Sequence, residues 1–277
     1  MSRWLVTGCS SGIGRQIVEV ALAAGHRVAA TARNPSTLAD LVAAHPESAL
    51  ALALDVTDRA SIASAVAETE HTFGGIDVLV NNAGYGYMAA VEEGEDAEVR
   101  AMFDTNYFGA VDAIKAVLPG MRARGEGRIL NVSSMTGLVA NPPNVYYSSS
   151  KFALEALTEG LAKELAPFGI RVGAIEPGAV RTDWATRSMK EARRPLDAYA
   201  ETVGARKEMI KGAAPRSAGD PRRVAEAALH WVAHPDPPLH LLLGRDVYDA
   251  YRQKLRELTE LVETWKDVTL DIDFRDD

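Results

Sequence analysis

The sequence predicts an α/β fold, in which helices cover both faces of a doubly wound parallel sheet of about seven strands. Short apolar runs of strand length alternate with longer stretches of helical periodicity. No low-complexity linker divides the chain. The 277 residues, 47% hydrophobic and 25% charged, are enough to bury a large core, so we expect a single domain over residues 1–277.

The N-terminal part predicts a strand, a glycine-rich turn, a helix and a second strand. Residues 4–6 are apolar, the turn spans residues 8–14, and the helical pattern continues to Ala24. Gly25 suits the end of this helix, because glycine adopts a positive φ without steric cost. Residues 28–30 then predict the second strand.

Cap residues mark the next two helices. Asn34 precedes Pro35, as at a helix start where proline takes the first helical position. Leucine alternates with alanine over residues 50–54, which predicts a buried third strand. Thr57 or Asp58 caps the helix that follows, and the fourth strand is expected after it at residues 76–80.

Three further strands complete the predicted sheet. Helical patterns at 96–123 and 146–166 flank a strand at 128–132, and residues 170–175 and 239–243 predict the last two strands. In open α/β sheets of this kind, ligands bind beyond the carboxyl ends of the strands. We therefore expect the functional site at that edge of the sheet.

Two segments lie outside this alternation. Residues 181–216 are polar and interrupted by prolines and glycines, which predicts a helical substrate lid that becomes ordered when ligand binds. Residues 247–266 predict an extra C-terminal helix, and the region 247–277 ends in an acidic tail at Asp276 and Asp277. The charges of this region are expected to face solvent.

The turn after the first strand is a candidate nucleotide-binding loop. Gly8, Gly12 and Gly14 allow a tight turn and a close approach of a ligand to the backbone. The helix that follows offers unpaired N–H groups to a pyrophosphate. The spacing G-x-x-x-G-x-G differs from the common pattern G-x-G-x-x-G, so the turn alone is also compatible with a loop that binds nothing.

The same segment fits a second motif, which leaves an alternative function open. Residues 8–12 match G-x-S-x-G, the nucleophile elbow of serine hydrolases, with Ser10 as the nucleophile. Only seven residues precede Gly8, and the sequence has no H-G-G-G segment to form an oxyanion hole. Both observations count against a hydrolase.

Tyr147 and Lys151 are a candidate acid/base pair, since residues four apart share a face of a helix. A tyrosine pKa near 10 must fall by about three units for ionisation at neutral pH, which requires about 4 kcal/mol. An ammonium about 4 Å away supplies this only in a partly desolvated cleft, where the effective dielectric constant is about 20. Tyr146 has no matching lysine, because residue 150 is serine.

Six motifs together resemble the short-chain dehydrogenase/reductase family over about residues 3–182. They are residues 7–14, residues 81–84, Asn106, Ser134, Tyr147-x-x-x-Lys151 and Pro177-Gly178. The resemblance implies a Rossmann-type fold, a nicotinamide cofactor and hydride transfer between an alcohol and a carbonyl. It also implies that Asn106 positions a water, Ser134 orients the carbonyl, Tyr147 is the acid/base, and Lys151 lowers the Tyr147 pKa and holds the nicotinamide ribose.

Cofactor contacts follow from the glycine-rich turn and from this resemblance. They are expected at Gly8, Ser10, Ser11, Gly12, Ile13, Gly14, Arg33, Asp55, Val56, Asn82, Ala83, Gly84, Tyr147, Lys151, Pro177, Gly178, Val180 and Thr182. NAD-dependent folds tend to place an acidic residue after the second strand, whereas Ala32 and Arg33 stand here. A guanidinium suits a 2′-phosphate, so we expect NADP(H).

Composition excludes several other classes of protein. The net charge is −8 without a dense Lys/Arg stripe, so a nucleic-acid partner is not expected. Apolar runs are shorter than the roughly 20 residues that span a bilayer, and the N-terminus lacks a signal-peptide core. Cys9 is the one cysteine, which fits a cytoplasmic location. His230 and His234 lie one turn apart without an obvious third ligand, so no metal site is predicted.

The substrate is expected to be a mainly hydrophobic ketone or secondary alcohol. Bulky side chains follow the fourth and fifth strands or lie in the lid, namely Tyr85, Tyr87, Met88, Leu138, Val139, Trp184, Met189, Tyr199 and Met209. The lid cations Arg187, Lys190, Arg193 and Arg194 are mixed with Glu191, which favours a solvated face.

Two further expectations concern assembly and an alternative role. The helical patterns at 107–119 and 152–165 are apolar on more than one face, which together with the resemblance predicts a homodimer or homotetramer. A non-catalytic nicotinamide-nucleotide sensor is the second alternative function, because a fold does not determine function.

Overall fold

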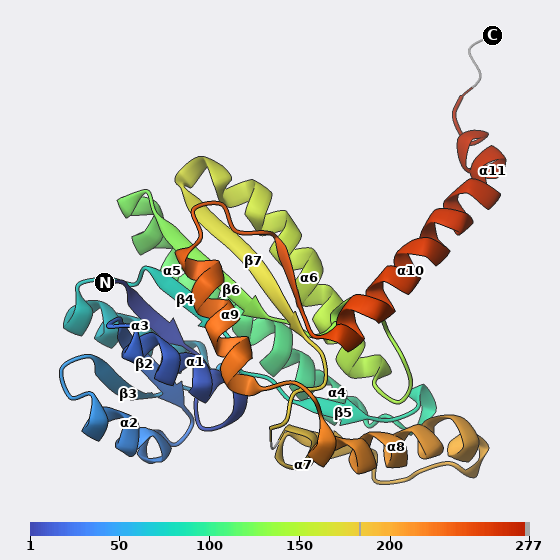
Figure 1. Cartoon of the computed structure of the whole chain (residues 1–277), viewed down its shortest axis with the longest axis horizontal. Helices are drawn as coiled ribbons and strands as arrows, with labels where there is room; N and C mark the ends of the chain where they lie inside the picture. Colours follow the sequence, from blue (N-terminus) through green and yellow to red (C-terminus); the bar gives the residue numbers. More distant parts are fainter. Residues whose placement is uncertain (183, 275–277) are drawn as a thin grey trace.

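Seven parallel strands form the central sheet of the computed structural model, which describes residues 1–182 and 184–274 (Figure 1). Their order across the sheet is β3-β2-β1-β4-β6-β7-β9. Their bounds are β1 Arg3–Val6, β2 Arg27–Ala32, β3 Ala49–Ala53, β4 Val78–Asn81, β6 Gly127–Val132, β7 Ile170–Pro177 and β9 His240–Leu243. The predicted doubly wound parallel sheet of seven strands is confirmed.

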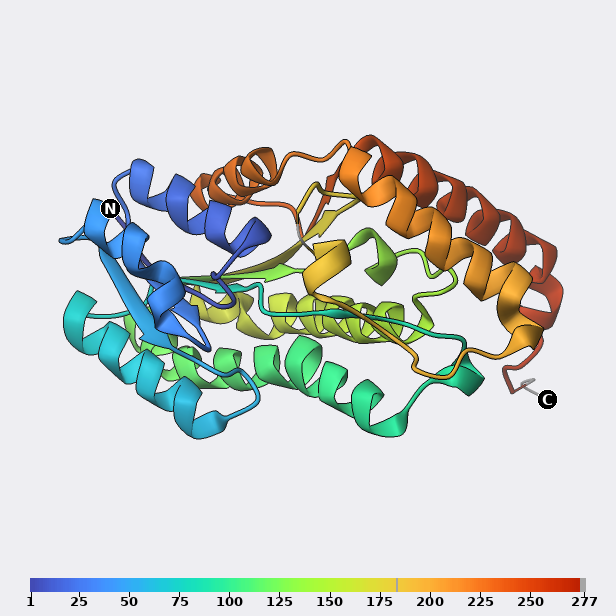
Figure 2. The same ribbon diagram turned by 90° about the horizontal axis from the view of Figure 1, so that it is seen from below.

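Helices cover both faces of this sheet (Figure 2). One face carries α1 (Gly12–Ala23) and α9 (Pro221–Ala233), and the other carries α3 (Arg59–Phe73), α5 (Gly109–Arg124) and α6 (Val145–Leu165). The remaining helices are α2 (Ala39–Ala44), α4 (Asp96–Phe103), α7 (Trp184–Arg187), α8 (Ala205–Ala213), α10 (Arg245–Thr264) and α11 (Lys266–Leu270). Short helical turns are η1 (Pro35–Leu38), η2 (Val91–Glu93), η3 (Asp104–Phe108), η4 (Met135–Gly137), η5 (Ala166–Phe168), η6 (Asp197–Tyr199), η7 (Ala200–Gly204) and η8 (Ala214–Arg216).

Side chains alternate between the two faces of each strand, so the sheet has a hydrophobic core on each face. Trp4 and Val6 pack with α1 and α9, whereas Leu5 between them packs with α3 and α5. The predicted helix ends are present. Gly25, after α1, has a φ of 81°, and the side chains of Asn34 and Asp58 accept backbone hydrogen bonds at the starts of η1 and α3.

The helix expected over 96–123 is interrupted. Between α4 and α5, η3 is a π-helical turn that contains Asn106. A π turn inserts one residue and rotates the following helix face. Apolar periodicity in the sequence continues across it, so the pattern alone predicted one unbroken helix.

The predicted lid at 181–216 contains α7, α8, several short turns and a strand that the sequence did not indicate. This strand, β8 (Met189–Glu191), pairs in parallel with β5 (Gly86–Met88) to form a separate two-stranded sheet. The expected C-terminal helix is present as α10, followed by α11, and the end of the acidic tail at Asp276 and Asp277 lies outside the described residues. Among the described residues, no helix combines the length and the apolar content that a bilayer crossing requires.

Candidate active site

The glycine-rich turn lies between the carboxyl ends of β1 and β4. The Asn82 amide donates to the carbonyl oxygens of Thr7 and Gly8, both at 2.9 Å, and the Thr7 hydroxyl accepts the N–H groups of Asn82 and Ala83. A Cβ on Gly8 would lie 2.8 Å from the Ala83 Cα, and one on Gly14 would lie 2.2 Å from the Asn82 Nδ2. Glycine is therefore required where the turn packs against residues 82–83.

The front of this turn could hold a phosphate group. Gly12 has a φ of +62°, and a Cβ there would meet Thr182 at 3.8 Å, which is an ordinary contact. The Ser11 side chain makes no capping hydrogen bond, so the first N–H groups of α1 remain available to an anion. The contact also brings Thr182, at the end of the loop after β7, next to the turn.

Cys9 lies behind this turn and fills space. It is fully buried, its thiol donates to the Val6 carbonyl oxygen, and burial raises its pKa to about 12. A thiol in this state is a poor nucleophile.

The ends of β2 and β3 bring Arg33 and Asp55 close together. Hydrogen bonds from Thr57 lower the pKa of the Asp55 carboxyl, and the nearby positive charge of Arg33 lowers it further. Arg33 is exposed, while Val56 packs against Gly109 at the start of α5. The remaining predicted cofactor contacts lie along the same edge and are mostly half-buried: Ser10, Ile13, Gly84, Gly178 and Val180, with Pro177 buried at the end of β7.

Tyr147 lies on the first turn of α6, and its side chain faces the carboxyl edge of the sheet. The residue is 6% exposed, and its ring centroid lies 5.2 Å from that of Trp184 in the lid. Burial raises the pKa of Tyr147 to about 12, and a hydrogen bond with the Ser134 hydroxyl opposes this shift. Tyr146 points elsewhere, because its hydroxyl donates to the Val91 carbonyl oxygen at 2.7 Å.

Lys151 is one helical turn beyond Tyr147 and is also buried. Its Nζ donates to the Val132 carbonyl oxygen at 2.8 Å and lies 5.8 Å from the centroid of the Tyr147 ring. Burial lowers the pKa of Lys151 to about 8, and the negative charge of Glu155 partly offsets that effect. The expected lowering of the Tyr147 pKa by Lys151 is not seen here: burial raises that pKa, and the hydrogen bond with Ser134 is what opposes the rise.

Asn106 is buried in η3, and its side chain is fully hydrogen-bonded. Its Nδ2 donates to the Tyr85 carbonyl oxygen and the Ser150 hydroxyl, and its Oδ1 accepts the Tyr85 N–H. A Cβ on Gly84 would lie 3.1 Å from the Asn106 Oδ1 and 3.7 Å from the Lys151 Nζ. Gly84 thus separates these two groups, and Asn106 fixes the loop after β4.

Two buried carboxylates and a histidine stand behind Lys151, and the sequence reasoning did not find them. The Nδ1 of His240 lies 3.0 Å from the Glu176 Oε1, with hydrogen-bond geometry, and 3.2 Å from the Glu155 Oε2 as an ion-pair contact. The carboxylate contacts, Glu155 first, raise the pKa of His240 to about 10, whereas burial raises that of Glu176 to about 7.

These three residues place ligand atoms within 4.8 Å of one another, a grouping in which a metal ion fits by distance. The positive charge of His240 faces both carboxylates and that of Lys151 acts on Glu155, so the charge of the cluster is balanced by the protein itself. One signal in the sequence pointed to part of it: Glu155 follows Lys151 by four residues, the spacing of an ion pair on a helix face.

The lid contacts the site through Trp184 and Met189. A Cβ on Gly86 would lie 2.9 Å from Trp184 and 2.6 Å from Met189. Tyr87 and Met88, expected to line a substrate pocket, are instead 0% and 1% exposed, because the pairing of β5 with β8 buries them. Lys190 and Arg193 form ion pairs with Glu98, in agreement with the solvated face expected for the lid cations.

Ser10 has no catalytic partner among the hydrogen-bonded histidines of the described residues. His26 bonds Ser2, His234 bonds Asp236, and His240 bonds Glu176. A serine nucleophile needs a base in contact with it, so this arrangement counts against the hydrolase alternative.

Comparison with known families agrees with this geometry. Residues 3–193 match the family model described as short chain dehydrogenase. Oxidoreductase BOA17 of Botryotinia fuckeliana is 38% identical over 268 residues, which cover 96% of this chain and 97% of that protein. The 3-ketodihydrosphingosine reductase of Bacteroides thetaiotaomicron is 36% identical over 241 residues, which cover 87% of each protein.

Solved structures show the same fold. A short-chain dehydrogenase from Streptomyces avermitilis superposes with a TM-score of 0.92 at 40% identity and covers 99% of this chain and 100% of its own. The closed form of a serine dehydrogenase in complex with NADP+ superposes with a TM-score of 0.75 at 28% identity, over 87% of this chain and 93% of that one.

Proposed function

Because the chain belongs to the short-chain dehydrogenase family, we propose that it is an NADP(H)-dependent oxidoreductase acting on CH–OH groups. It interconverts a carbonyl and a secondary alcohol on a mainly hydrophobic small molecule. The observation that carries this proposal is the buried Tyr147, which contacts Ser134 and Trp184 and has Lys151 behind it at the carboxyl edge of the sheet.

The residues along this edge fit a nicotinamide nucleotide. The glycine-rich turn and the free N–H groups of α1 suit its pyrophosphate, and Asp55 and Val56 would contact the adenine. Residues 82–84 and 177–182 would flank the nicotinamide, and Lys151 would hold its ribose. Bound there, the nucleotide supplies or accepts the hydride.

The protein groups handle the proton. In the reduction direction, Tyr147 gives its phenolic proton to the carbonyl oxygen, which Ser134 orients by a hydrogen bond. The high pKa of Tyr147 keeps this proton in place until substrate arrives. The Lys151 ammonium, fixed by the Val132 carbonyl, then stabilises the phenolate. Asn106 supports the relay by holding the loop after β4 beside Lys151.

The cofactor preference rests on Arg33, which is exposed beyond β2 near Asp55. One charge-assisted contact with a 2′-phosphate contributes about 1.5–3 kcal/mol, so NADPH should bind at least about tenfold more tightly than NADH. Titration of nucleotide fluorescence measures both dissociation constants. Arg33→Ala should remove the preference, whereas Lys163→Ala, at an exposed ion pair with Glu159 on α6, should keep it. Equal affinities in the unmodified protein would contradict the assignment.

The substrate preference rests on the contact of Trp184 with Tyr147, which places a large apolar surface beside the reacting oxygen. The relative that acts on 3-ketodihydrosphingosine also points to a lipophilic ketone. We expect lipophilic ketones to be reduced faster than sugars, and Trp184→Ala to lower kcat/KM for them about tenfold through KM. Nicotinamide absorbance measures the rates with the two substrate classes and the kcat/KM of the variant.

The control is Met209→Ala in the lid. This side chain is 52% exposed, so its loss should change kcat/KM little. A preference for polar sugars contradicts the substrate class. Binding of nucleotide without turnover on any ketone or alcohol would favour the nicotinamide-nucleotide sensor.

The assembly is proposed to be a homodimer or homotetramer of one-domain subunits. Helices α5 and α6 pack on the sheet with one face, while Phe108 just before α5 is 51% exposed and Phe152 on α6 is 38% exposed. Exposed aromatics beside two neighbouring helices are typical of a surface that pairs with another copy.

A further inference from the structure

The C-terminal arm, here α10 and α11 over residues 245–270, carries an apolar stripe that no other described residue covers. In Figure 1 the arm projects away from the body. Val247 is buried at its base, and every residue of α10 from Leu255 onward is exposed. In proteins, most of the stability of a helix comes from packing of its apolar face and not from helix propensity. The arm therefore requires a surface that the single chain does not supply.

The spacing of the stripe indicates what that surface is. Tyr248, Tyr251, Leu255, Leu258, Val262 and Trp265 recur at intervals of three and four residues. This is the a/d pattern of a heptad repeat, a narrow seam that fits another helix rather than a sheet or a broad groove.

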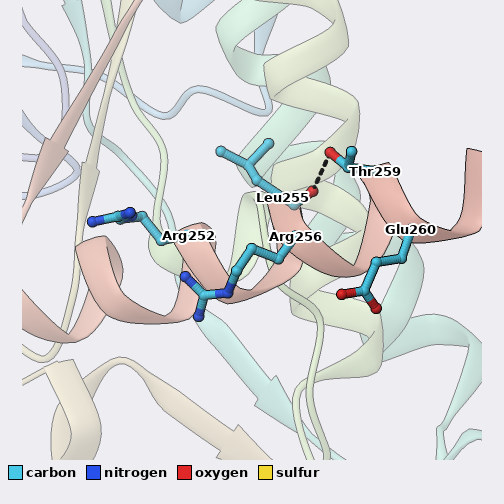
Figure 3. A pocket seen from close by; sticks show the side chains of 5 residues that line it. All are labelled: Arg252, Leu255, Arg256, Thr259 and Glu260. Atoms are coloured by element: carbon cyan, nitrogen blue, oxygen red, sulfur yellow. Dashed lines mark hydrogen bonds between the residues drawn. The ribbon is translucent and has the colours of Figure 1, made fainter.

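A shallow hollow lies on α10 beside the stripe. It is open to solvent, has a volume of about 370 Å³ and is lined by Arg252, Leu255, Arg256, Thr259 and Glu260 (Figure 3). Leu255 is the one residue of this set that belongs to the stripe, so the hollow lies beside the seam and not on it. Thr259 donates to the Leu255 carbonyl oxygen at 2.9 Å, so no partner is needed for that hydroxyl.

We propose that the arm pairs with the arm of a second copy of this chain to form a two-stranded coiled coil. The acidic residues Glu257, Glu260, Glu263 and Asp267 lie on the outer positions of the heptad, away from the seam. The flanking positions carry Arg252, Lys254, Thr259, Leu261 and Lys266. In a parallel pair, Leu261 faces the partner's Lys266, while Lys254 is held by its own body, so like charges do not oppose each other.

The available area is sufficient for a stable pair. Seven apolar side chains on the seam or the flanking positions are 43 to 62% exposed: Tyr248, Leu255, Leu258, Leu261, Val262, Trp265 and Val268. At roughly 100 Å² each they offer about 700 Å² per copy, within the range of roughly 600–1,000 Å² that one partner contributes to a standard interface. The acidic outer face disfavours the other common occupant of an amphipathic helix, an anionic membrane surface.

The base of the arm is fixed to the body near the site. The Lys254 ammonium donates to the Leu138 carbonyl oxygen and lies 4.7 Å from the centroid of the Phe152 ring on α6. These contacts set the direction in which the arm leaves the body. The seam begins at this base and continues beyond it.

The test compares the full-length protein with the variant Leu258→Glu/Val262→Glu. The arms join copies that the α5 and α6 surfaces do not, so multi-angle light scattering should show that the variant has half the mass of the unmodified protein, and circular dichroism should show loss of helix corresponding to about 20 residues. Turnover per subunit should not change, because neither residue contacts the site, and this separates dissociation from misfolding. The control Glu260→Gln/Glu263→Gln, on the outer face, should keep the original mass and helix content.

Equal masses for the unmodified protein and the Leu258→Glu/Val262→Glu variant would overturn the proposal. It would equally be overturned if the unmodified protein were a monomer whose arm binds phosphatidylcholine vesicles, because the occupant would then be a membrane. Neither outcome depends on cofactor or substrate, so the proposed reaction is tested separately.

Discussion

Replacing Tyr147 by phenylalanine is expected to lower kcat for ketone reduction by about three orders of magnitude, within the range of general acid catalysis. The substitution removes the phenolic proton and the hydrogen bond with Ser134 but keeps the ring that packs against Trp184. The dissociation constant for NADPH should change little, because the glycine-rich turn and Arg33 are untouched. Single-turnover absorbance and nucleotide titration measure the two effects.

Tyr146→Phe is the matched control for this substitution. The Tyr146 hydroxyl donates to the Val91 carbonyl oxygen, away from Ser134, so its loss removes one exposed hydrogen bond. Turnover should stay within about twofold, since one such bond contributes only about 1 kcal/mol to stability and does not touch the reacting atoms. Equal losses in the two variants would show that Tyr147 is not the proton donor.

Replacing Lys151 by methionine is expected to lower kcat about a hundredfold. At 5.8 Å from the Tyr147 ring and an effective dielectric constant of about 20, one positive charge stabilises a phenolate by about 3 kcal/mol, and this corresponds to about two orders of magnitude in rate. Methionine fills a similar volume in the buried position without the charge. Lys163→Met, at an exposed lysine of the same helix, should leave kcat unchanged.

The same assignment predicts a pH dependence for reduction. Burial lowers the pKa of Lys151 to about 8, so its positive charge is present below that pH and is lost as the pH rises through it. Tyr147, with a pKa raised to about 12, stays protonated over this range. The kcat/KM for reduction should therefore fall above about pH 8, and this fall should be absent from the residual activity of Lys151→Met. A flat profile between pH 7 and pH 9.5 in the unmodified enzyme would contradict the role of Lys151.

Much of the fold was predictable because its signals are local. Gly25 ends α1 through its own positive φ, and Asn34 and Asp58 cap helices through hydrogen bonds to residues two positions away. Alternating apolar runs and helical patterns predicted seven parallel strands, since parallel neighbours require a crossover between them. The positions of Ser134, Tyr147 and Lys151 at one edge follow from this connectivity, although their roles stay a prediction.

Other features depended on contacts between residues far apart in the sequence. The pairing of β5 with β8 buries Tyr87 and Met88, which the pattern had assigned to a substrate pocket. The π turn at Asn106 leaves no periodic signal, because apolar spacing continues on either side of it. Glu155, Glu176 and His240 meet only because α6, β7 and β9 are neighbours in space.

The sequence by itself therefore determined the order of the elements, the glycine-rich turn and the tyrosine–lysine pair, since each depends on residues within one helix turn or one loop. The tertiary structure decided the electrostatics of the site. Burial raises the pKa of Tyr147 and lowers that of Lys151. Folding also brings two carboxylates together behind the lysine. Desolvation depends on the atoms that surround a group from every side, and these come from elements that only folding brings together.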